Sequence, residues 1–298
     1  MSEIKILQGN CLHTLAQLPE KSINTVVTSP PYWGLRDYGQ YDQLGLEETP
    51  EKFVENLVDV FREVKRVLRD DGTVWLNLGD SYSSHKDCKS IPQSLSKGTN
   101  AEKAHVIEKG KSVSRDTKKL KSVGLKNKDL IGIPWRVAFA LQADGWYLRQ
   151  DIIWNKPNPM PESVQDRCTK SHEYIFLLSK SPKYYYDNEA IKEEIQVTSD
   201  MGNEKRNKRS VWTVTTKPYS EAHFATYPHD LIIPCILAGC PEGGTVLDPF
   251  GGSGTTAQVA AQLNRNAVLC ELNQEYVEIA QKRLQDSLGM FLKLNINR

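Results

Sequence analysis

The chain has 298 residues, a formal net charge of +1 and 39% hydrophobic residues, which is ordinary for a globular protein. No run of about 18 apolar residues occurs, which excludes a transmembrane helix, and the N-terminal stretch lacks the apolar core of a signal peptide. The six cysteines include no CxxC pair, which favours reduced thiols in a cytoplasmic protein and predicts no metal site.

Short apolar strands and amphipathic helices alternate along the chain. Strands are predicted at 4–9, 23–28, 73–78, 147–155, 173–179, 244–248 and 267–272. Helices are predicted at about 11–18, 51–68, 134–143, 229–238, 254–263 and 273–286, with Asp-Asp-Gly at 70–72 expected to stop the second. This alternation, with several strands that are wholly apolar, indicates an α/β domain on a mostly parallel sheet.

Positive charge gathers in two segments that have few apolar residues. Between 85 and 129 there are twelve Lys or Arg and five Asp or Glu, a local charge of +7, and "NEKRNKR" follows at 203–209. We expect 83–130 to be a mobile basic insertion rather than a packed element. A polyanion that meets one face of the molecule explains this charge, and a solvated loop explains 85–129 equally well.

The strand at 23–28 ends in the stretch "TSPPYW". Proline has no N–H to donate, so two prolines cannot continue a sheet ladder. The strand therefore ends on a stiff turn that presents Ser29, Tyr32 and Trp33. Taken alone, this turn is also compatible with a purely structural strand end.

A second turn, in "VLDPFGGSGTTAQVAAQL" at 246–263, is rich in glycine and opens a helix. Such a turn lets the backbone approach a ligand closely. It has no lysine before the Ser/Thr position, unlike a nucleoside-triphosphate loop. Gly252, Gly254 and Ala257 fit the weak nicotinamide pattern G-x-G-x-x-A, and Glu271 ends the next strand, where it could take ribose hydroxyls. A tight turn without a ligand is the third interpretation.

The position of the glycine turn predicts an unusual strand order. Only 44 residues follow Gly254, enough for one more strand and one more helix. A dinucleotide domain needs several further βα units after its first turn, and here they lie upstream. The sheet must therefore be circularly permuted, with the glycine-turn strand in mid-sheet beside the strand that ends in "TSPPYW". Both strand ends would then face one crevice.

The two motifs in this order resemble the β-group, circularly permuted amino-methyltransferases of DNA. "SPPY" stands at 29–32 and "DPFGGSGTT" at 248–256. Further similar stretches are "QDIIWNKPNPMPES" at 150–163, "RSVWTV" at 209–214, "HFATYPHDLI" at 223–232 and "CELNQEYVEIAQKRL" at 270–284. The resemblance covers most of the chain except roughly 83–130 and 187–208. It implies a permuted Rossmann-like, S-adenosylmethionine-dependent methyltransferase sheet with inserted DNA-recognition segments.

The resemblance also implies a division of the chain. Residues 1–82 and 131–186 would form the catalytic half, and 218–298 the cofactor-binding half. The basic insertion at 83–130 and a candidate target-recognition segment at 187–217 complete the division. The implied partners are double-stranded DNA and a cognate restriction endonuclease acting on the same site, in the cytoplasm of a bacterium or encoded by a phage.

The family's cofactor residues carry over to two regions of this chain. Asp248, Pro249, Phe250, Gly251, Gly252, Ser253 and Gly254 would line the methionine end of S-adenosylmethionine. Glu271 would accept from the ribose hydroxyls, and Phe224, Ala225 and Thr226 would hold the amino-acid part or the adenine. Asn10 would approach the adenine, at a position where the family usually has Asp.

The catalytic role falls on the "SPPY" turn. Ser29 Oγ and the Pro30 carbonyl, held rigid by Pro30 and Pro31, would accept hydrogen bonds from the target amine while Tyr32 stacks on a flipped-out base. Neither a metal nor a covalent nucleophile is needed. Serine at the first position is usual for N4-cytosine enzymes, so we expect cytosine. The alternatives are an N6-adenine enzyme, an RNA amino-methyltransferase, a non-catalytic DNA-binding protein and a nicotinamide-dependent oxidoreductase.

Several residues are candidates for DNA contacts. We expect Trp33, Arg36 and Tyr38 to close over the flipped base, with plain packing as the alternative for Trp33. Lys156 and Arg167 could contact phosphates, although ordinary surface charge explains each as well. Arg206 and Arg209 belong to the candidate recognition segment. His172 with Glu173 lacks the H-E-x-x-H spacing and is interpreted as structural.

Overall fold

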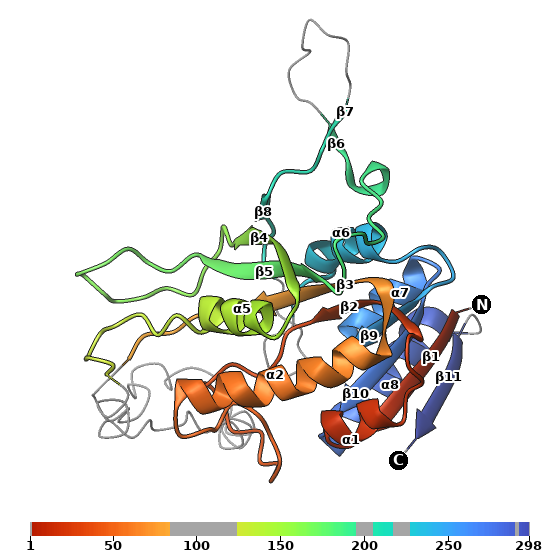
Figure 1. Cartoon of the computed structure of the whole chain (residues 1–298), viewed down its shortest axis with the longest axis horizontal. Helices are drawn as coiled ribbons and strands as arrows, with labels where there is room; N and C mark the ends of the chain where they lie inside the picture. Colours follow the sequence, from red (N-terminus) through yellow and green to blue (C-terminus); the bar gives the residue numbers. More distant parts are fainter. Residues whose placement is uncertain (1, 84–123, 195–204, 217–226, 290–291, 298) are drawn as a thin grey trace, which may run out of the picture.

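The structure is a computed structural model that describes residues 2–83, 124–194, 205–216, 227–289 and 292–297. One large sheet, in the order β11-β1-β10-β9-β2-β3-β5-β4-β8, runs through the molecule with helices on both faces (Figure 1). Its strands are β1 (Ser2–Gln8), β2 (Ile23–Thr28), β3 (Leu68–Leu78), β4 (Tyr147–Asn155), β5 (His172–Ser179), β8 (Val211–Thr213), β9 (Thr245–Asp248), β10 (Asn266–Glu271) and β11 (Leu292–Asn297). A short ribbon pairs β6 (Glu193–Glu194) with β7 (Lys205–Arg206).

The helices divide between the two faces of the sheet. They are α1 (Cys11–Ala16), α2 (Pro50–Val67), α5 (Ile133–Ala143), α6 (His229–Gly239), α7 (Thr255–Gln262) and α8 (Gln274–Leu288), with a 3-10 turn η2 (Glu189–Ile191). Apolar side chains of α1, α2 and α5 form one core with the sheet, and those of α6, α7 and α8 form the other. Phe53, Leu57 and Phe61, on one face of α2, are completely buried. Burial of this apolar stripe is what stabilises the long helix against the sheet.

The strand order confirms the permuted arrangement. β2 and β9 are parallel neighbours in mid-sheet, with Thr25 opposite Val246 and Val26 opposite Leu247. β10 and β1 follow on one side and β3 on the other, all parallel. The sheet is mostly parallel, as predicted, and the antiparallel strand β5 lies between β3 and β4.

Two features of the sheet differ from the prediction. Strands β8 and β11 were not predicted, because neither has a long apolar run. The Asp-Asp-Gly stretch does not separate α2 from β3: the helix ends at Val67 and the strand starts at Leu68. Asp70 and Asp71 are tolerated in the strand because their side chains are exposed and form ion pairs with Lys21 and Arg69.

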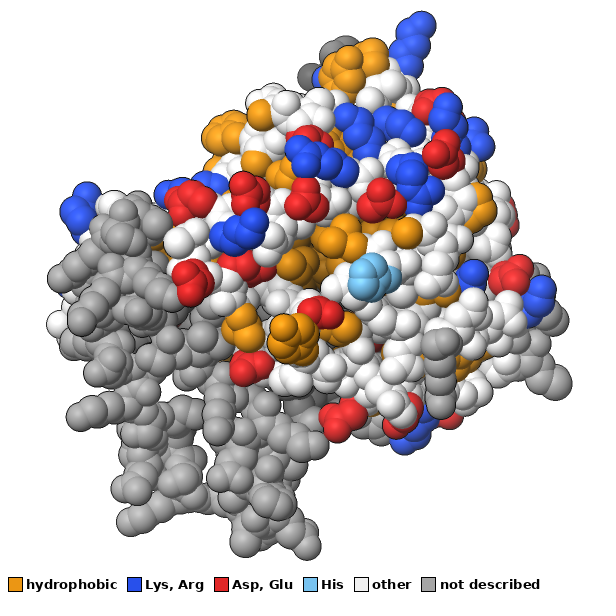
Figure 2. Space-filling view, turned by 60° about the horizontal axis from the view of Figure 1, so that its bottom comes forward, with side chains coloured by type: hydrophobic (Ala, Val, Ile, Leu, Met, Phe, Trp, Pro, Cys, Tyr) orange, Lys and Arg blue, Asp and Glu red, His pale blue; other side chains and the backbone are white. Residues whose placement is uncertain are grey.

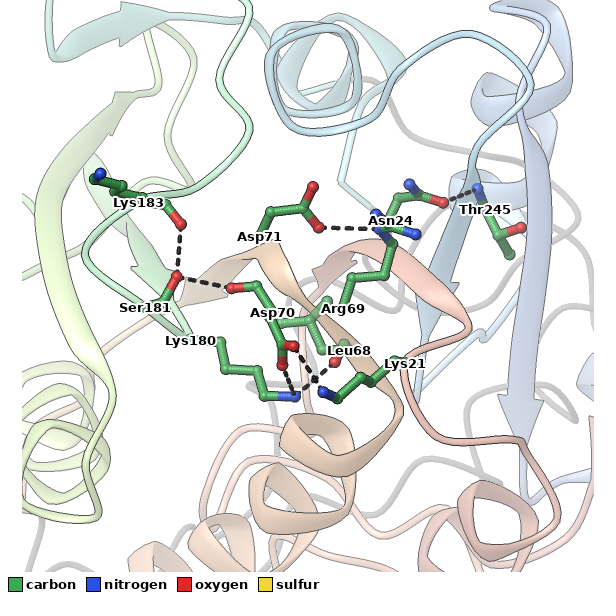
Figure 3. Close-up of polar contacts among 10 residues, drawn as sticks. All are labelled: Lys21, Asn24, Leu68, Arg69, Asp70, Asp71, Lys180, Ser181, Lys183 and Thr245. Carbon is green, nitrogen blue, oxygen red and sulfur yellow. Dashed lines mark hydrogen bonds and ion pairs between the residues drawn. The ribbon is translucent and has the colours of Figure 1, made fainter.

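Polar contacts link the strands at the end of the sheet where β2, β3 and β9 begin (Figure 3). Asp70 forms ion pairs with Lys21 at 2.7 Å and with Lys180 at 3.2 Å. Ser181 Oγ donates to the Asp70 carbonyl oxygen at 2.8 Å, which ties β3 to the turn after β5. Asn24 Oδ1 accepts from the Thr245 N–H at 2.9 Å and joins the start of β9 to β2.

The basic insertion is described only at its two ends. Tyr82 and Leu130 form an antiparallel bridge, and the Ser83 N–H donates to the Asp129 carbonyl oxygen at 2.8 Å. Residues 84–123 and 195–204 lie outside the described residues, and with them most of the predicted basic surface. Within the described part of the chain, no helix has the length and hydropathy needed to cross a bilayer.

Candidate active site

A cavity of about 1320 Å³ opens where β1, β2, β9 and β10 reach their carboxyl ends. Both predicted turns line it: Ser29, Pro30, Pro31 and Tyr32 from one, and Asp248, Pro249, Phe250, Gly251, Gly252 and Ser253 from the other. Asn10 and Glu271 line it as well. The crevice at a switch in strand order is thus formed by segments more than two hundred residues apart in the chain.

Asp248 links the two turns. Its side chain is only 2% exposed. One carboxylate oxygen accepts from Thr28 Oγ1 at 2.6 Å and from the Phe250 N–H at 3.1 Å; the other accepts from Thr256 Oγ1 at 2.6 Å and Tyr227 Oη at 2.9 Å. Burial raises the Asp248 pKa, and the hydrogen bonds oppose that shift. These four donors show that the carboxylate holds the end of β2 against the start of the glycine turn.

The glycine turn needs its glycines for backbone shape and packing. Gly252 has φ of +50° and Gly254 of +82°, which favour glycine. A Cβ on Gly251 would lie 2.8 Å from Leu269 Cβ. Gly254 does not line the cavity; it precedes α7, and a Cβ there would lie 3.0 Å from Ala280 Cβ. Glycine at this position is therefore also required by the packing of α7 against α8.

Glu271 ends β10 with its carboxylate at the cavity. Oε2 accepts from the Gly252 N–H at 2.7 Å, and Oε1 accepts from the Asn273 N–H at 2.8 Å. Burial raises the Glu271 pKa to about 7, against the effect of these backbone donors. An ionised carboxylate offers about four acceptor positions, so this one can still accept from two hydroxyl groups.

Asn10 follows β1, whose carboxyl end lies beside that of β10. The Gly9 N–H donates to the Glu271 carbonyl oxygen at 2.9 Å, which fixes the end of β1 next to β10. Asn10 Oδ1 caps α1 by accepting from the Leu12 N–H at 3.0 Å. The Asn10 side chain, at a position where the family usually has Asp, thus stabilises the start of α1 by capping it.

Tyr32 meets a group of polar residues at the back of the cavity. Its hydroxyl donates to Glu173 Oε2 at 2.7 Å. Asn77 Nδ2 donates to the same Glu173 oxygen at 3.3 Å, and Lys156 forms an ion pair with Oε1. Burial, and then the charge of Glu173, raise the Tyr32 pKa well above its ordinary value, so the phenol keeps its proton at neutral pH.

The candidate DNA-contacting residues have different surroundings. Trp33 is only 4% exposed, packs in the core and donates through Nε1 to the Glu47 carbonyl oxygen at 2.9 Å. This burial corrects its predicted place over a base, because the ring stabilises the loop after the turn. Arg36 and Tyr38 line the cavity. Arg167 stacks on the Tyr82 ring, 3.8 Å from its centroid.

Three further cations are already paired. Lys156 does not project outward, because it binds Glu173 and lies 4.1 Å from the centroid of the Trp154 ring. Arg206 and Arg209 both contact Glu193 Oε1, at 2.9 and 2.6 Å. These two side chains remain on the surface and hold the end of the β6–β7 ribbon. Any phosphate that they bind must compete with this carboxylate.

Some site residues were not singled out from the sequence, and others cannot be placed. Phe224, Ala225 and Thr226 lie outside the described residues. Tyr227, the residue after them, donates to Asp248 Oδ2 at 2.9 Å and lies within the stretch 223–232 that resembles the family. Asn77 is not singled out by the sequence, and Glu173 is interpreted there, with His172, only as structural. The proximity of both residues to Tyr32 depends on the antiparallel pairing of β3 with β5. The spacing of Lys156 and Glu173 in the sequence does not by itself predict that they form this partly buried ion pair.

Charge and apolar surface are distributed unevenly around the molecule. Figure 2 brings the lower side of Figure 1 forward: hydrophobic side chains gather near the middle of this face, and Lys and Arg gather above them. Acidic side chains are interspersed between the two groups. An apolar centre beside a basic region is suited to a ligand with an aromatic part and an anionic part.

Comparison with known proteins shows close sequence relatives. A family model described as DNA methylase matches residues 23–282. The type II methyltransferase M.Cfr9I of Citrobacter freundii is 54% identical over 280 residues, which cover 94% of this chain and 87% of that protein. M.SmaI of Serratia marcescens, also a type II methyltransferase, is 51% identical over 286 residues, covering 94% and 90%.

Solved structures share the fold at lower identity. The PvuII DNA methyltransferase (cytosine-N4-specific) superimposes with a TM-score of 0.66 at 18% identity, over 99% of this chain and 95% of that one. A DNA modification methylase from Thermus thermophilus, TTHA0409, in complex with S-adenosyl-L-methionine, gives a TM-score of 0.61 at 23% identity, over 97% and 98%. At these identities the likeness concerns the fold.

Proposed function

Since this chain belongs to the family of DNA methylases that modify exocyclic amines, we propose that it transfers a methyl group from S-adenosylmethionine to N4 of cytosine in duplex DNA. The methyl donor and the type II methyltransferase class follow from the family. The choice of cytosine, the flipped base and the individual residue roles are our proposals. The observation that supports these proposals is that the "SPPY" turn and the glycine turn line the same cavity.

The residues around the glycine turn fit the cofactor. Glu271 has acceptor positions left beyond its two backbone donors and would take the ribose hydroxyls. Backbone of the turn from Pro249 to Ser253 would border the methionine end, and Asn10 the adenine. When bound, S-adenosylmethionine supplies an electrophilic methyl group on a positively charged sulfur.

The "SPPY" turn would prepare the amine. An exocyclic amine on cytosine is a weak nucleophile because its lone pair is delocalised into the ring. Acceptors at Ser29 Oγ and the Pro30 carbonyl would hold its two N–H groups and aim the lone pair at the methyl group. These acceptors would also stabilise the positive charge that develops on the amine nitrogen as it is methylated.

A base inside a duplex cannot reach this cavity, so the target must be extruded, at a cost of a few kcal/mol. Tyr32 at the cavity wall would stack on the extruded base, with Arg36 and Tyr38 nearby. Arg206 and Arg209 would supply salt-sensitive phosphate contacts from the candidate recognition segment. Serine rather than Asp or Asn before the two prolines is the feature that favours cytosine over adenine.

The test is product identification. The purified protein is incubated with S-adenosylmethionine and unmethylated genomic DNA, and the DNA is digested to nucleosides for mass spectrometry. N4-methyldeoxycytidine is the expected product. N6-methyldeoxyadenosine as the sole product would overturn the choice of base, and methyl transfer to RNA but not to DNA would overturn the choice of substrate. Coexpression with a candidate endonuclease gene, scored by protection of host DNA, tests the proposed partner.

A further inference from the structure

One exposed apolar side chain lies at the mouth of the cavity. Met160 lines the cavity, yet it is 85% exposed. Three other exposed large hydrophobic residues of the described chain line the cavity, and they are much less exposed: Leu12 at 36%, Leu35 at 45% and Leu46 at 38%. Since Met160 borders the cavity but keeps most of its surface in solvent, it projects from the rim. Burial of that surface by a ligand is favourable.

The segment that carries Met160 is braced at its start. Pro159 and Pro161 flank Met160, and each fixes its own backbone φ angle. Asn158 Oδ1 accepts from the Thr216 N–H at 3.0 Å, and Asn158 Nδ2 donates to the Thr216 carbonyl oxygen at 3.1 Å. Thr216 belongs to the candidate target-recognition segment. These two hydrogen bonds therefore tie the base of the projection to a part of the chain that we expect beside the DNA.

The segment is braced at its end as well. The Glu162 carboxylate accepts from both terminal nitrogens of Arg167, at 2.8 and 3.1 Å, and from the Lys170 N–H at 2.9 Å. Arg167 also stacks on the Tyr82 ring, so these contacts reach the base of the basic insertion. With both ends held, the segment loses little conformational entropy when its apolar tip is buried against a ligand.

The proposed reaction creates a gap that such a tip fits. An extruded base stays attached to its strand, so the position that it vacates in the base stack lies next to the mouth of the cavity that receives it. Proteins that deform DNA insert apolar side chains, methionine among them, between base steps. Methionine is unbranched and polarisable, so it adapts to an irregular gap and makes favourable contacts with aromatic rings.

We propose that Met160 is a positioning residue, which enters the gap that the target cytosine leaves in the base stack and holds the duplex open while the base occupies the cavity. This inference rests on the proposed function, because it needs an extruded base. Met160 contacts the neighbouring bases rather than the reacting amine. Its loss should therefore affect extrusion of the base, and neither the binding of S-adenosylmethionine nor the methyl transfer step itself.

The test uses an oligonucleotide duplex with one methylation site, mapped beforehand by sequencing methylated genomic DNA. Met160→Ala removes the side chain beyond Cβ, and Met160→Leu keeps an apolar side chain of similar volume. Val164→Ala is the matched control, because Val164 is an exposed apolar residue of the same loop that does not line the cavity. Single-turnover methylation is measured with the target cytosine opposite guanine and opposite adenine, since extrusion of a mismatched base costs less free energy.

We expect Met160→Ala to slow methylation of the matched duplex about tenfold or more, and to stay within about threefold of the wild-type rate on the mismatched duplex. Met160→Leu and Val164→Ala should stay within about threefold of wild type on both duplexes, and all variants should bind S-adenosylmethionine with unchanged affinity by calorimetry. A wild-type rate of Met160→Ala on the matched duplex, or an equal loss on both duplexes, would overturn the proposal. A wild-type protein that methylates neither duplex would instead count against the proposed function.

A second measurement reports extrusion directly. A 2-aminopurine base in place of the target cytosine fluoresces more strongly once it leaves the base stack. At saturating protein, Met160→Ala should raise this fluorescence less than about half as much as wild type, and Met160→Leu as much as wild type. Equal fluorescence with Met160→Ala and with wild type would contradict insertion at the vacated position, whatever the rate on the mismatched duplex.

Discussion

Thr28 and Asp248 are 220 positions apart in the chain, yet Thr28 Oγ1 donates to Asp248 Oδ1 at 2.6 Å. Thr28 is the last residue of β2 and Asp248 the last residue of β9, so the contact joins the two parallel strands where both turns begin. The "SPPY" turn and the glycine turn are thus held in register by one buried hydrogen bond as well as by the sheet.

Replacing Thr28 with valine tests this link. Valine keeps the shape and removes the donor, which leaves Asp248 with three hydrogen-bond donors in a buried site. We expect Thr28→Val to lower the free energy of unfolding by about 1–3 kcal/mol, measured in urea. Thr213→Val, at an exposed position of β8, is the control and should change it by less than about 0.5 kcal/mol. Equal effects of the two substitutions would contradict a special role for Thr28.

Cofactor affinity should depend on pH through Glu271. Hydroxyl donors favour the carboxylate, and burial raises its pKa to about 7 in the free protein. Affinity should therefore be nearly constant above about pH 8 and fall roughly tenfold by about pH 6, because protonated Glu271 must first ionise. Calorimetric titration across this range checks the prediction. Glu271→Gln should bind weakly at every pH, and a wild-type affinity that stays flat down to about pH 6 would count against the role of Glu271.

Addition of a single methyl group at Gly79 should displace Tyr32 of the "SPPY" turn. A Cβ there would lie 2.6 Å from Tyr32 Cε2 and 3.2 Å from Glu173 Cδ. Gly79→Ala must therefore displace the phenol from its acceptor, and we expect about a tenfold or greater loss of methylation rate. Gly39→Ala is a matched control for loss of glycine, since its Cβ would meet no atom within 4 Å, although its φ of +71° adds backbone strain. A wild-type rate for Gly79→Ala would show that the ring position is not critical.

Glu193 should restrain DNA binding by holding Arg206 and Arg209. Removing its charge frees both guanidinium groups for phosphates, so Glu193→Gln should tighten DNA binding at low salt by several-fold and steepen its salt dependence. Arg209→Ala should weaken binding and reduce the salt slope by about one. Fluorescence anisotropy on duplex DNA at several salt concentrations measures both. If neither variant shifts the slope, the β6–β7 ribbon lies away from the DNA.

The order of the two motifs in the sequence was sufficient to predict which two strands are neighbours at the centre of the sheet. A turn with only one βα unit after it had to belong to a permuted sheet, and the parallel pairing of Val26 with Leu247 confirms that argument. Trp33 shows the limit of the same reasoning, because an aromatic residue after a turn can face either the core or a ligand. Glu173 shows a second limit of sequence-based reasoning. Its contact with Tyr32 depends on the register of β5 against β3, which no local sequence pattern predicts.

The neighbours of β1 have a consequence for how the protein forms. β1 pairs only with β10 and β11 among the described strands, and their residues begin at Asn266. Its backbone donors and acceptors therefore find their partners in a segment far along the chain. Such distant pairing slows folding and leaves strand edges exposed until the distant segment has docked. The permutation that brings the two turns into one crevice thus also makes completion of the sheet depend on contacts between distant parts of the chain.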